Sequence, residues 1–252
     1  MHLTGLGYPQ EKLPLDRVLD VGCGSGQNTR CLAPHFRSVL ATDISPAQIK
    51  EATARNTFAN IEYRVAAAEE IPMPAESVQL VTACTCCHYF DMPRFFAEAD
   101  RVLAPAGILG IYSVRTPKVY RNGMFSTELN HVLMQAFEAI GNDWGRVWKD
   151  VEDRYGDPRF RLPYPGEVRD ESHDQEQTLT LDGLLGFIGS LGSFQKMMAR
   201  CGAERGEALL QLTRERFQSV LSNGKPEVDT SDIGITLRHP YFLLMARKPV
   251  SR

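Results

Sequence analysis

The sequence predicts an α/β fold with a seven-stranded, mostly parallel sheet, helices on both faces and a helical insertion after the fifth strand. Three observations lead to this prediction. Short apolar runs alternate with helical patterns through about residue 115, which is typical of βαβ units. A glycine-rich segment follows the first apolar run, and the alternation stops after Ser113. Because crossovers between parallel strands are right-handed, helices are expected on both faces of the sheet.

Five strands are expected before the alternation stops, at residues 17–21, 38–42, 61–66, 78–84 and 108–112. The helices between them are expected at residues 27–36, 46–56 and 92–103. Ser45 and Asp91 are predicted N-caps, because their side chains can accept from a free N–H of the first turn. Pro46 suits that turn, where its missing N–H costs nothing.

The second half of the chain has a less regular pattern. Residues 116–168 are too many for a plain loop and hold helical patterns, of which 126–140 is the clearest, so a helical insertion or lid is predicted. The remaining elements are expected as a sixth strand within 167–181, helices at 182–199 and 206–221, and a last strand at 234–247.

The composition of the 252 residues is that of an ordinary soluble globular protein, with 43% hydrophobic and 23% charged residues. The net charge of −3 and the lack of a basic run argue against nucleic acid as a partner. No apolar stretch approaches the ~20 residues that span a bilayer, and residues 1–9 lack a secretory signal pattern. A cytoplasmic monomer or homodimer with no membrane and no nucleic-acid partner is expected.

The six cysteines are expected to be thiols, because a chain of this length without a signal rarely carries a disulfide framework. Cys84, Cys86, Cys87 and His88 lie close together in the sequence. Four-ligand metal sites usually draw on two separated ligand pairs, and no second pair is evident. No metal is therefore predicted, and the cluster is interpreted as a buried strand end.

The segment Asp20-Val21-Gly22-Cys23-Gly24-Ser25-Gly26 directly follows the first strand. Its glycines allow a sharp turn and a close approach of backbone to a ligand, and the next helix directs free N–H groups toward the same space. Asp43 ends the second strand, where an acid can accept hydrogen bonds from both ribose hydroxyls. The third glycine comes two positions after the second instead of three, which argues against a dinucleotide.

Several segments resemble the cofactor motifs of class I S-adenosylmethionine-dependent methyltransferases, which have a Rossmann-like fold. They are residues 18–26, 41–45, 69–74 and the turn 100–107. Softer patterns resemble the subgroup of trans-aconitate methyltransferase-like proteins, namely residues 88–91, 191–194 and 240–249. The resemblance implies one domain over residues 1–252, with a cofactor-binding half at 1–115, the insertion or lid at 116–168 and the C-terminal part of the sheet at 169–252.

The resemblance also implies S-adenosylmethionine as the cofactor and a role for each matching residue. Asp20 and the backbone of the three glycines, Gly22, Gly24 and Gly26, would lie along the methionine part. Asp43 would hold the ribose and Ile44 would pack on the adenine. The remaining contacts implied are Ala68 and Glu69 at the adenine edge, and Thr85, Cys86 and His88 beside the sulfonium.

Two departures from the family pattern stand out. Ala67 occupies a position where relatives often have an Asp that holds the adenine amino group, so that contact is lost or moved. The family usually has an N-terminal helical segment that covers the cofactor, whereas about fifteen residues precede the first strand here. The cover is therefore expected to be missing, reduced, or supplied by the insertion or another subunit.

His88 is the predicted catalytic residue, because it lies beyond the carboxyl end of the fourth strand, where ligands bind in such sheets. A carboxylate acceptor needs no base, whereas a phenol, alcohol or amine acceptor can use one, for which histidine is the usual choice. The alternative is that His88 only caps or packs the turn. The predicted substrate-binding residues are Tyr89, Arg115, Tyr120, Arg121, Trp144 and Trp148.

For the basic residues the expected role is a carboxylate clamp, and for the aromatic residues a wall of the acceptor pocket. The alternative for each is a solvated helix face or packing within the lid. The leading hypothesis is O-methylation of a small organic acid. The alternatives are a lyase or cyclase that uses the aminobutyrate arm of the same cofactor, and a non-catalytic cofactor-binding protein.

Overall fold

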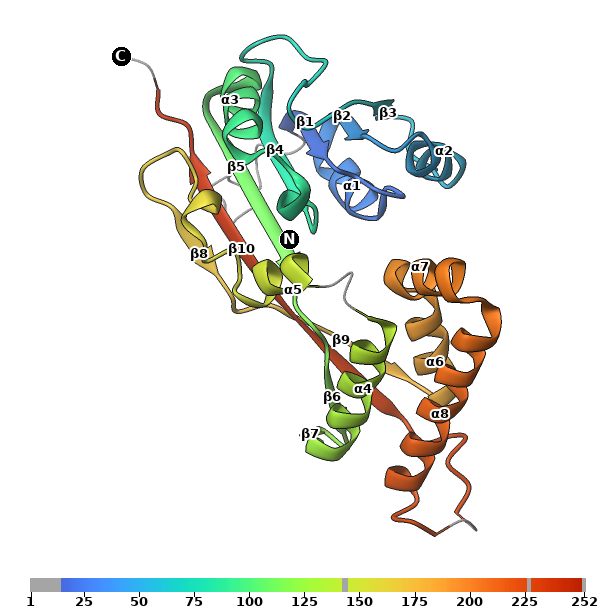
Figure 1. Ribbon diagram of the computed structural model, residues 1–252. Helices are drawn as coiled ribbons and strands as arrows, with labels where there is room; N and C mark the ends of the chain where they lie inside the picture. The colour runs from blue at the N-terminus through green and yellow to red at the C-terminus, as the bar shows by residue number, and fades with distance from the viewer. Residues whose placement is uncertain (1–14, 142–144, 226–227, 251–252) are drawn as a thin grey trace. The chain divides into compact units, whose positions relative to one another are not determined.

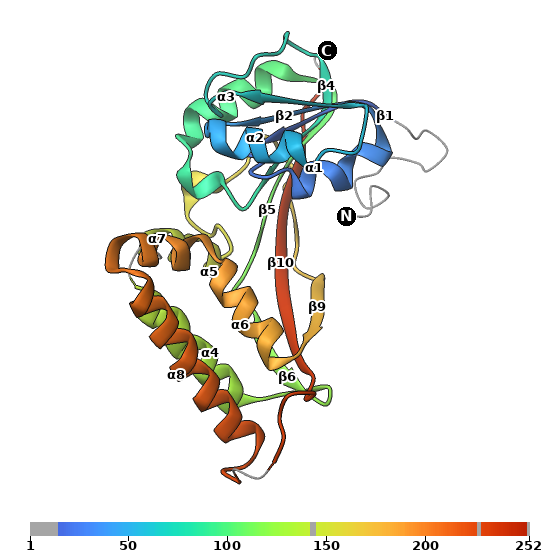
Figure 2. The same cartoon turned by 90° about the vertical axis from the view of Figure 1, so that its right-hand side faces the viewer.

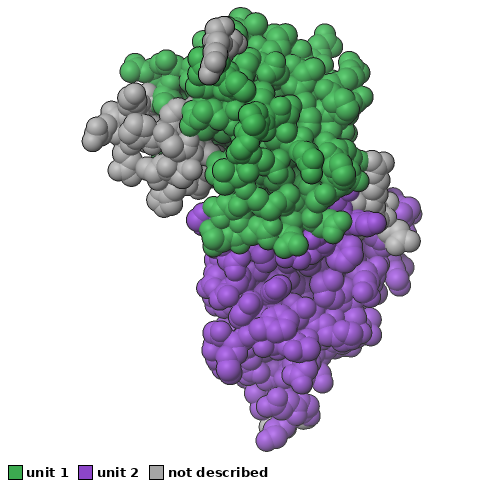
Figure 3. Space-filling view, turned by 90° about the vertical axis from the view of Figure 1, so that its left-hand side faces the viewer, with its two compact units in different colours: residues 1–114, 153–172, 242–252 green, residues 115–152, 173–241 purple. Residues whose placement is uncertain are grey.

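The computed structural model describes residues 15–141, 145–225 and 228–250. The chain divides into two compact units, coloured separately in Figure 3. Unit 1 comprises residues 1–114, 153–172 and 242–252, and unit 2 comprises residues 115–152 and 173–241. Trp144 and residues 1–9, on which predictions were made above, lie outside the described residues.

Unit 1 contains the parallel strands in the order β3-β2-β1-β4-β5, and the antiparallel β10 follows β5 in the sheet. Parallel pairs join β1 to β2 and β4, β2 to β3, and β4 to β5. The bounds are β1 Leu15–Val21, β2 Phe36–Asp43, β3 Ile61–Val65, β4 Val78–Cys84 and β5 Leu103–Val114. The first four agree with the predicted positions to within two residues at each end, and the predicted α/β class with its parallel strands is confirmed. The sheet has ten strands among the described residues where seven were expected, because β6 to β9 add antiparallel pairs.

The strand β5 begins earlier than predicted. The N–H of Ala106 donates to the carbonyl of Lys248 at 3.1 Å, and the N–H of Lys248 donates to the carbonyl of Gly107 at 2.8 Å. These hydrogen bonds join the start of β5 to the residue that follows β10 (Ile235–Arg247). Residues that were expected to form a turn therefore become part of the sheet. The short strand β8, Val168–Asp170, pairs antiparallel with β10 on its residues 243–245.

The helices of unit 1 are α1 Gln27–Leu32, α2 Pro46–Ala54 and α3 Met92–Val102, with short 3₁₀ turns η3 Ala33–His35, η4 Cys87–Tyr89 and η6 Pro158–Phe160. Both predicted caps are confirmed: Ser45 accepts from the N–H of Gln48, and Asp91 accepts from the N–H of Arg94. The helix α1 contacts β1 and β2, α2 contacts β2 and β3, and α3 contacts β5.

Unit 2 has its own apolar core. Its helices are α4 Thr127–Ile140, α5 Gly145–Glu152, α6 Leu181–Ser190, α7 Gly192–Cys201 and α8 Ala203–Leu221. Figures 1 and 2 show α4 running beside α8. Three short strands belong to unit 2, namely β6 Lys118–Arg121, β7 Met124–Phe125 and β9 Asp174–Leu179. The strands β6 and β9 each pair antiparallel with the first part of β10, and β7 pairs antiparallel with β6.

The division of the chain differs from the three predicted segments. Residues 116–152 belong to unit 2, whereas residues 153–168 belong to unit 1. The reason is packing: Tyr155 and Phe160 stack in unit 1 with ring centroids 4.3 Å apart, and the hydroxyl of Tyr164 donates to Asp100 at 2.9 Å. The prediction of a single domain over residues 1–252 stays a prediction. Among the described residues, no helix combines the length and apolar character that a membrane span requires.

Candidate active site

The glycine segment after β1 forms a turn that only glycine suits. Gly22, Gly24 and Gly26 have φ angles of 66°, 53° and 79°, in the left-handed region that other residues rarely adopt. A Cβ at Gly22 would lie 2.7 Å from Sγ of Cys86, and a Cβ at Gly26 would collide with the hydroxyl of Tyr63. The turn is therefore fixed by its own backbone and by side chains from β3 and the segment after β4.

Asp20 is fully buried at the end of β1, and its carboxylate faces protein groups. It accepts hydrogen bonds from Asn28 Nδ2 at 2.7 Å, Thr29 Oγ1 at 2.6 Å and Thr82 Oγ1 at 2.9 Å. Burial raises its pKa. These contacts tie α1 and β4 to β1, so Asp20 acts on the predicted site by positioning the glycine turn and α1. Asn28 also accepts a hydrogen bond from the hydroxyl of Tyr112 on β5.

Asp43 lies at the end of β2 and holds the glycine turn directly. Its Oδ2 accepts from the N–H of Gly24 at 2.9 Å, and its Oδ1 accepts from the N–H of Ser45 at 2.9 Å. Each carboxylate oxygen retains acceptor capacity, and the residue is partly exposed. This is the arrangement that a ligand with two hydroxyls requires.

Next to Asp43, Ile44 exposes 73% of its surface, which is unusual for a large aliphatic side chain. It provides an apolar face beside the acid, as stacking of a flat base requires. Ala68 is buried, and Ala67 and Glu69 are partly exposed. Oε1 of Glu69 accepts from the N–H of Asp91 at 2.9 Å, which joins the segment after β3 to the N-terminus of α3.

The segment after β4 carries backbone strain. Thr85 has a φ of 56°, which is costly for a β-branched residue, and such strain concentrates at functional sites. It is held by its N–H, which donates to the carbonyl of Tyr112 at 2.8 Å, and by the hydroxyl of Ser113, which donates to Thr85 Oγ1 at 3.3 Å. Cys86 is buried and its thiol donates to the carbonyl of Val21 at 3.3 Å.

His88 is half-buried in η4, and its Nδ1 lies 2.9 Å from the hydroxyl of Tyr155. Burial lowers the pKa of His88 to about 4, so its imidazole is neutral at physiological pH. Tyr89 is 69% exposed and packs its ring edge against His88 at a centroid distance of 4.3 Å. Tyr155 was missed by sequence reasoning, because it is separated from His88 by more than sixty residues and no motif marks it.

The other predicted substrate residues that the structure describes lie in unit 2. Arg115 donates to Glu152 at 2.9 Å, and Trp148 donates to Thr116 Oγ1 at 2.9 Å. The ring of Tyr120 is covered by the guanidinium of Arg238 at 4.2 Å. Arg121 lies on β6, where it pairs with Met124 of β7. The predicted cofactor-binding residues and His88 thus belong to unit 1, whereas these four residues do not.

A family model described as a methyltransferase domain matches residues 19–111. This range contains the glycine turn, Asp43, Ile44 and the segment after β4. This match and the methyltransferase relatives described below support a domain of the class I S-adenosylmethionine-dependent methyltransferase superfamily. S-adenosylmethionine is the cofactor of this domain, and the acid at Asp43 with the exposed Ile44 beside it fits a ribose and an adenine. The trans-aconitate-like subgroup stays a prediction.

Individual relatives agree with this assignment. A candidate methyltransferase of Dictyostelium discoideum is 30% identical over 180 residues, which cover 71% of this chain and 65% of that protein. The malonyl-[acyl-carrier protein] O-methyltransferase of Methylovorus sp. is 27% identical over 85% of this chain and 72% of its own length. The chain spans less than two thirds of the length of the Dictyostelium relative.

A solved structure described as a candidate type II methyltransferase from Anaeromyxobacter dehalogenans is similar over nearly the whole chain. Its TM-score is 0.70 at 26% identity, and the match covers 95% of this chain and 93% of that one. The similarity therefore extends beyond residues 19–111 and includes the segments that form unit 2.

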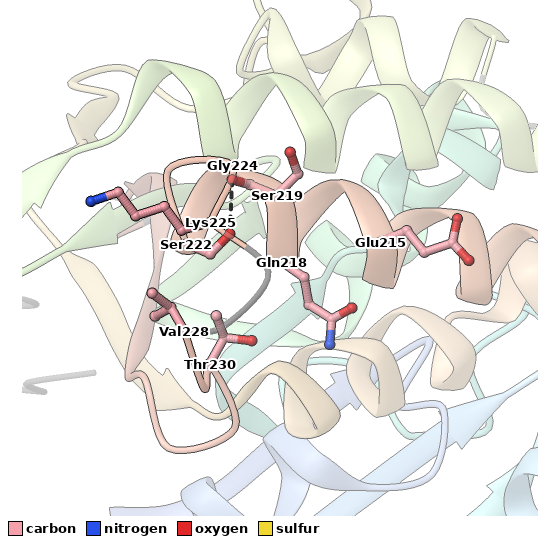
Figure 4. A pocket seen from close by; sticks show the side chains of 8 residues that line it. All are labelled: Glu215, Gln218, Ser219, Ser222, Gly224, Lys225, Val228 and Thr230. Carbon is pink, nitrogen blue, oxygen red and sulfur yellow. Dashed lines mark hydrogen bonds between the residues drawn. The ribbon is translucent and has the colours of Figure 1, made fainter.

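A pocket in unit 2 lies at the C-terminal end of α8 (Figure 4). Polar side chains predominate in its lining, and none of them is a predicted site residue. The lining residues are Glu215, Gln218, Ser219, Ser222, Gly224, Lys225, Val228 and Thr230. The residues that carry methyl-transfer chemistry in the prediction are in unit 1.

Proposed function

We propose that the protein transfers the methyl group of S-adenosylmethionine to an oxygen of a small organic carboxylic acid. The cofactor supplies a methyl group activated by a positively charged sulfur. Asp43 would accept hydrogen bonds from the ribose hydroxyls, and Ile44 would pack on the adenine. Asp20, through Asn28 and Thr29, would keep the glycine turn and α1 in place.

The observation that carries the proposal is the burial of groups around His88, among them Cys86 and Tyr155. Burial lowers the pKa of His88 to about 4, raises that of Cys84 to about 12, and raises those of Cys86 and Tyr155. Each of these groups is therefore neutral at physiological pH. None of the four is a strong base that takes the proton of a phenol or an alcohol, whose pKa values are about 10 or higher.

A carboxylic acid suits such a site because it is already ionised. Its carboxyl pKa is about 4, so it is a nucleophile at neutral pH, and its methylation releases no proton. The main tasks of the protein are then to align the acceptor oxygen with the methyl group and to exclude water. The name of the Methylovorus relative, an O-methyltransferase of a malonyl group, agrees with an acid as acceptor.

The acceptor-binding role of the unit 2 residues is part of the proposal. Arg115 is paired with Glu152, but its Nε is buried without a hydrogen-bond partner. A bound carboxylate would supply that partner. Trp148, Tyr120 and Arg121 are proposed to take part in acceptor recognition, as is Tyr89.

The test is mass spectrometry of the purified full chain with S-adenosylmethionine alone, then with small carboxylic acids and their matched alcohols. S-adenosylhomocysteine and a methyl ester that appear only with an acid would support the proposal. An Asp43→Asn variant serves as the control, because it removes one carboxylate oxygen from the ribose site. The same incubation with the variant should yield markedly less product.

Other outcomes would contradict the proposal in distinct ways. Methylthioadenosine formed without an acceptor would indicate lyase or cyclase chemistry on the aminobutyrate arm. Methylation of alcohols and not of acids would show that a base operates despite the lowered pKa of His88. Cofactor that stays bound with no turnover across the acids would count against acid methylation and for the non-catalytic alternative.

A further inference from the structure

Tyr155 and His88 are joined by a hydrogen bond in unit 1 that the methyltransferase motifs do not include. Tyr155 precedes η6, whereas His88 lies in η4 directly after β4. The Tyr155 hydroxyl lies 2.9 Å from Nδ1 of His88, and the two rings are tilted at 51° with centroids 6.1 Å apart. The contact therefore consists of one hydrogen bond and not of ring stacking.

Tyr155 is held firmly in this position. Its side chain is 1% exposed, Phe160 stacks on it at 4.3 Å, and Phe242 of β10 meets it edge-on at 5.0 Å. Its φ angle of 54° lies in the left-handed region, which is strained for a tyrosine. The ring packing offsets this strain and restricts the hydroxyl to a position beside Nδ1 of His88. An exposed tyrosine side chain would not be restricted in this way.

The chemistry of the two groups sets the direction of the hydrogen bond. Burial raises the pKa of Tyr155, so its hydroxyl keeps its proton and needs an acceptor for it. The aromatic neighbours Phe160 and Phe242 have no lone pair to offer, and the Ser113 hydroxyl is the other polar group that interacts with the Tyr155 hydroxyl. The unprotonated nitrogen of a neutral imidazole is a good acceptor, and the nitrogen in reach is Nδ1.

We propose that Tyr155 is a positioning residue that donates to Nδ1 of His88 and so fixes His88 in the tautomer whose Nε2 carries the proton. His88 then presents an uncharged N–H donor to the acceptor and is not a general base. This donor can hold one oxygen of a carboxylate while the other oxygen is methylated. The last step rests on the function proposed above, whereas the tautomer does not.

The tautomer is measured directly, without any acceptor. Long-range ¹H–¹⁵N correlation spectra of the ¹⁵N-histidine-labelled full chain show which ring nitrogen of each histidine carries the proton. A His88→Gln variant identifies the His88 signals by their disappearance. The wild-type chain is expected to show the Nε2–H form of His88. An Nδ1–H form would overturn the proposal.

Tyr155→Phe removes the hydroxyl and keeps the ring. We expect a measurable fraction of the Nδ1–H tautomer to appear at His88, and unchanged tautomers in this variant would overturn the proposal. Two controls separate this effect from loss of structure. Phe160→Leu weakens the stacking and should lower the Tm but keep the Nε2–H form. Ser113→Ala removes the other side chain that interacts with the Tyr155 hydroxyl and should also keep it.

Kinetics distinguish the two levels of the proposal. In Tyr155→Phe, the acceptor KM should rise by the inverse of the fraction of His88 that stays in the donor tautomer, while the KM for S-adenosylmethionine is unchanged. A tautomer change in Tyr155→Phe with no activity on any acid would contradict the function and leave the positioning role supported. Methylation of an acid by the chain, together with an unchanged tautomer in Tyr155→Phe, would support the function and contradict the positioning role.

Discussion

The N–H of Gly24 donates a 2.9 Å hydrogen bond to Oδ2 of Asp43. The acid at the end of β2 thus holds the middle glycine of the turn after β1, in addition to the ribose that it would bind. The second oxygen of Asp43 accepts from the N–H of Ser45, which caps α2. One carboxylate therefore orders the two segments that flank the predicted cofactor site.

Asp43→Asn should weaken binding of S-adenosylmethionine by at least about tenfold, because an amide has one acceptor oxygen in place of two and charged hydrogen bonds are worth about 1.5–3 kcal/mol. Isothermal titration calorimetry measures this change. Glu62→Gln is the matched control, since Glu62 is an exposed acid on β3 that pairs with Arg64. Equal affinities in all three proteins would remove Asp43 from the cofactor site.

Ile44→Ser should weaken cofactor binding by about 10-fold or more while leaving the Tm nearly unchanged. The side chain is 73% exposed, so folding gains little from it, whereas burying an isoleucine against a ligand is worth about 1.5–3 kcal/mol. Val168→Ser on β8 is the control, because Val168 is 51% exposed and outside the predicted site. A similar loss of affinity in both variants would argue for a general effect.

Gly26→Ala should destabilise the chain by about 1–3 kcal/mol, because it combines a φ of 79° with a collision against the Tyr63 hydroxyl. Tyr63→Phe alone should cost little, since that hydroxyl is buried without a hydrogen-bond partner. In the double variant, part of the cost of Gly26→Ala should be recovered. Urea unfolding of the four proteins forms a double-mutant cycle, and strict additivity would rule out the collision.

Thr85→Gly should raise the stability by about 1 kcal/mol and lower the activity, because it releases the strain of a φ of 56° but loosens the segment that carries His88. The control is Glu76→Gly, at an exposed position with a φ of 52° in the segment between β3 and β4. That variant should gain stability with full activity. A fully active Thr85→Gly variant would show that the strain has no functional role.

Stability should fall on acidification partly through His88. Its folded pKa of about 4 lies below the ordinary value of 6.5, so between these pH values the unfolded chain binds a proton that the folded chain does not. The free energy of unfolding therefore decreases as pH falls from about 6.5 toward 4. The Tm of His88→Gln should decrease less than that of the wild type over this range, and equal slopes would contradict the lowered pKa.

The sequence by itself determined the cofactor half of the protein. The apolar runs at β1 to β4, the caps Ser45 and Asp91, and the glycine turn depend on local features, namely hydrophobic pattern, side-chain capping and permitted φ angles. The position of Asp43 also followed, because the carboxyl ends of neighbouring parallel strands meet at one edge of a sheet. Interactions between residues close in sequence therefore determine most of the secondary structure of this half of the chain.

The tertiary structure alone decided the surroundings of His88. The Tyr155 hydroxyl reaches Nδ1 because Phe160 and Phe242 hold its ring in place. The burial of His88 itself lowers its pKa. It also decided that residues 153–172 join unit 1 while Arg115 and Trp148 belong to unit 2. These relationships depend on desolvation and on contacts between residues distant in sequence, for which a single sequence has no periodic or motif-level signal.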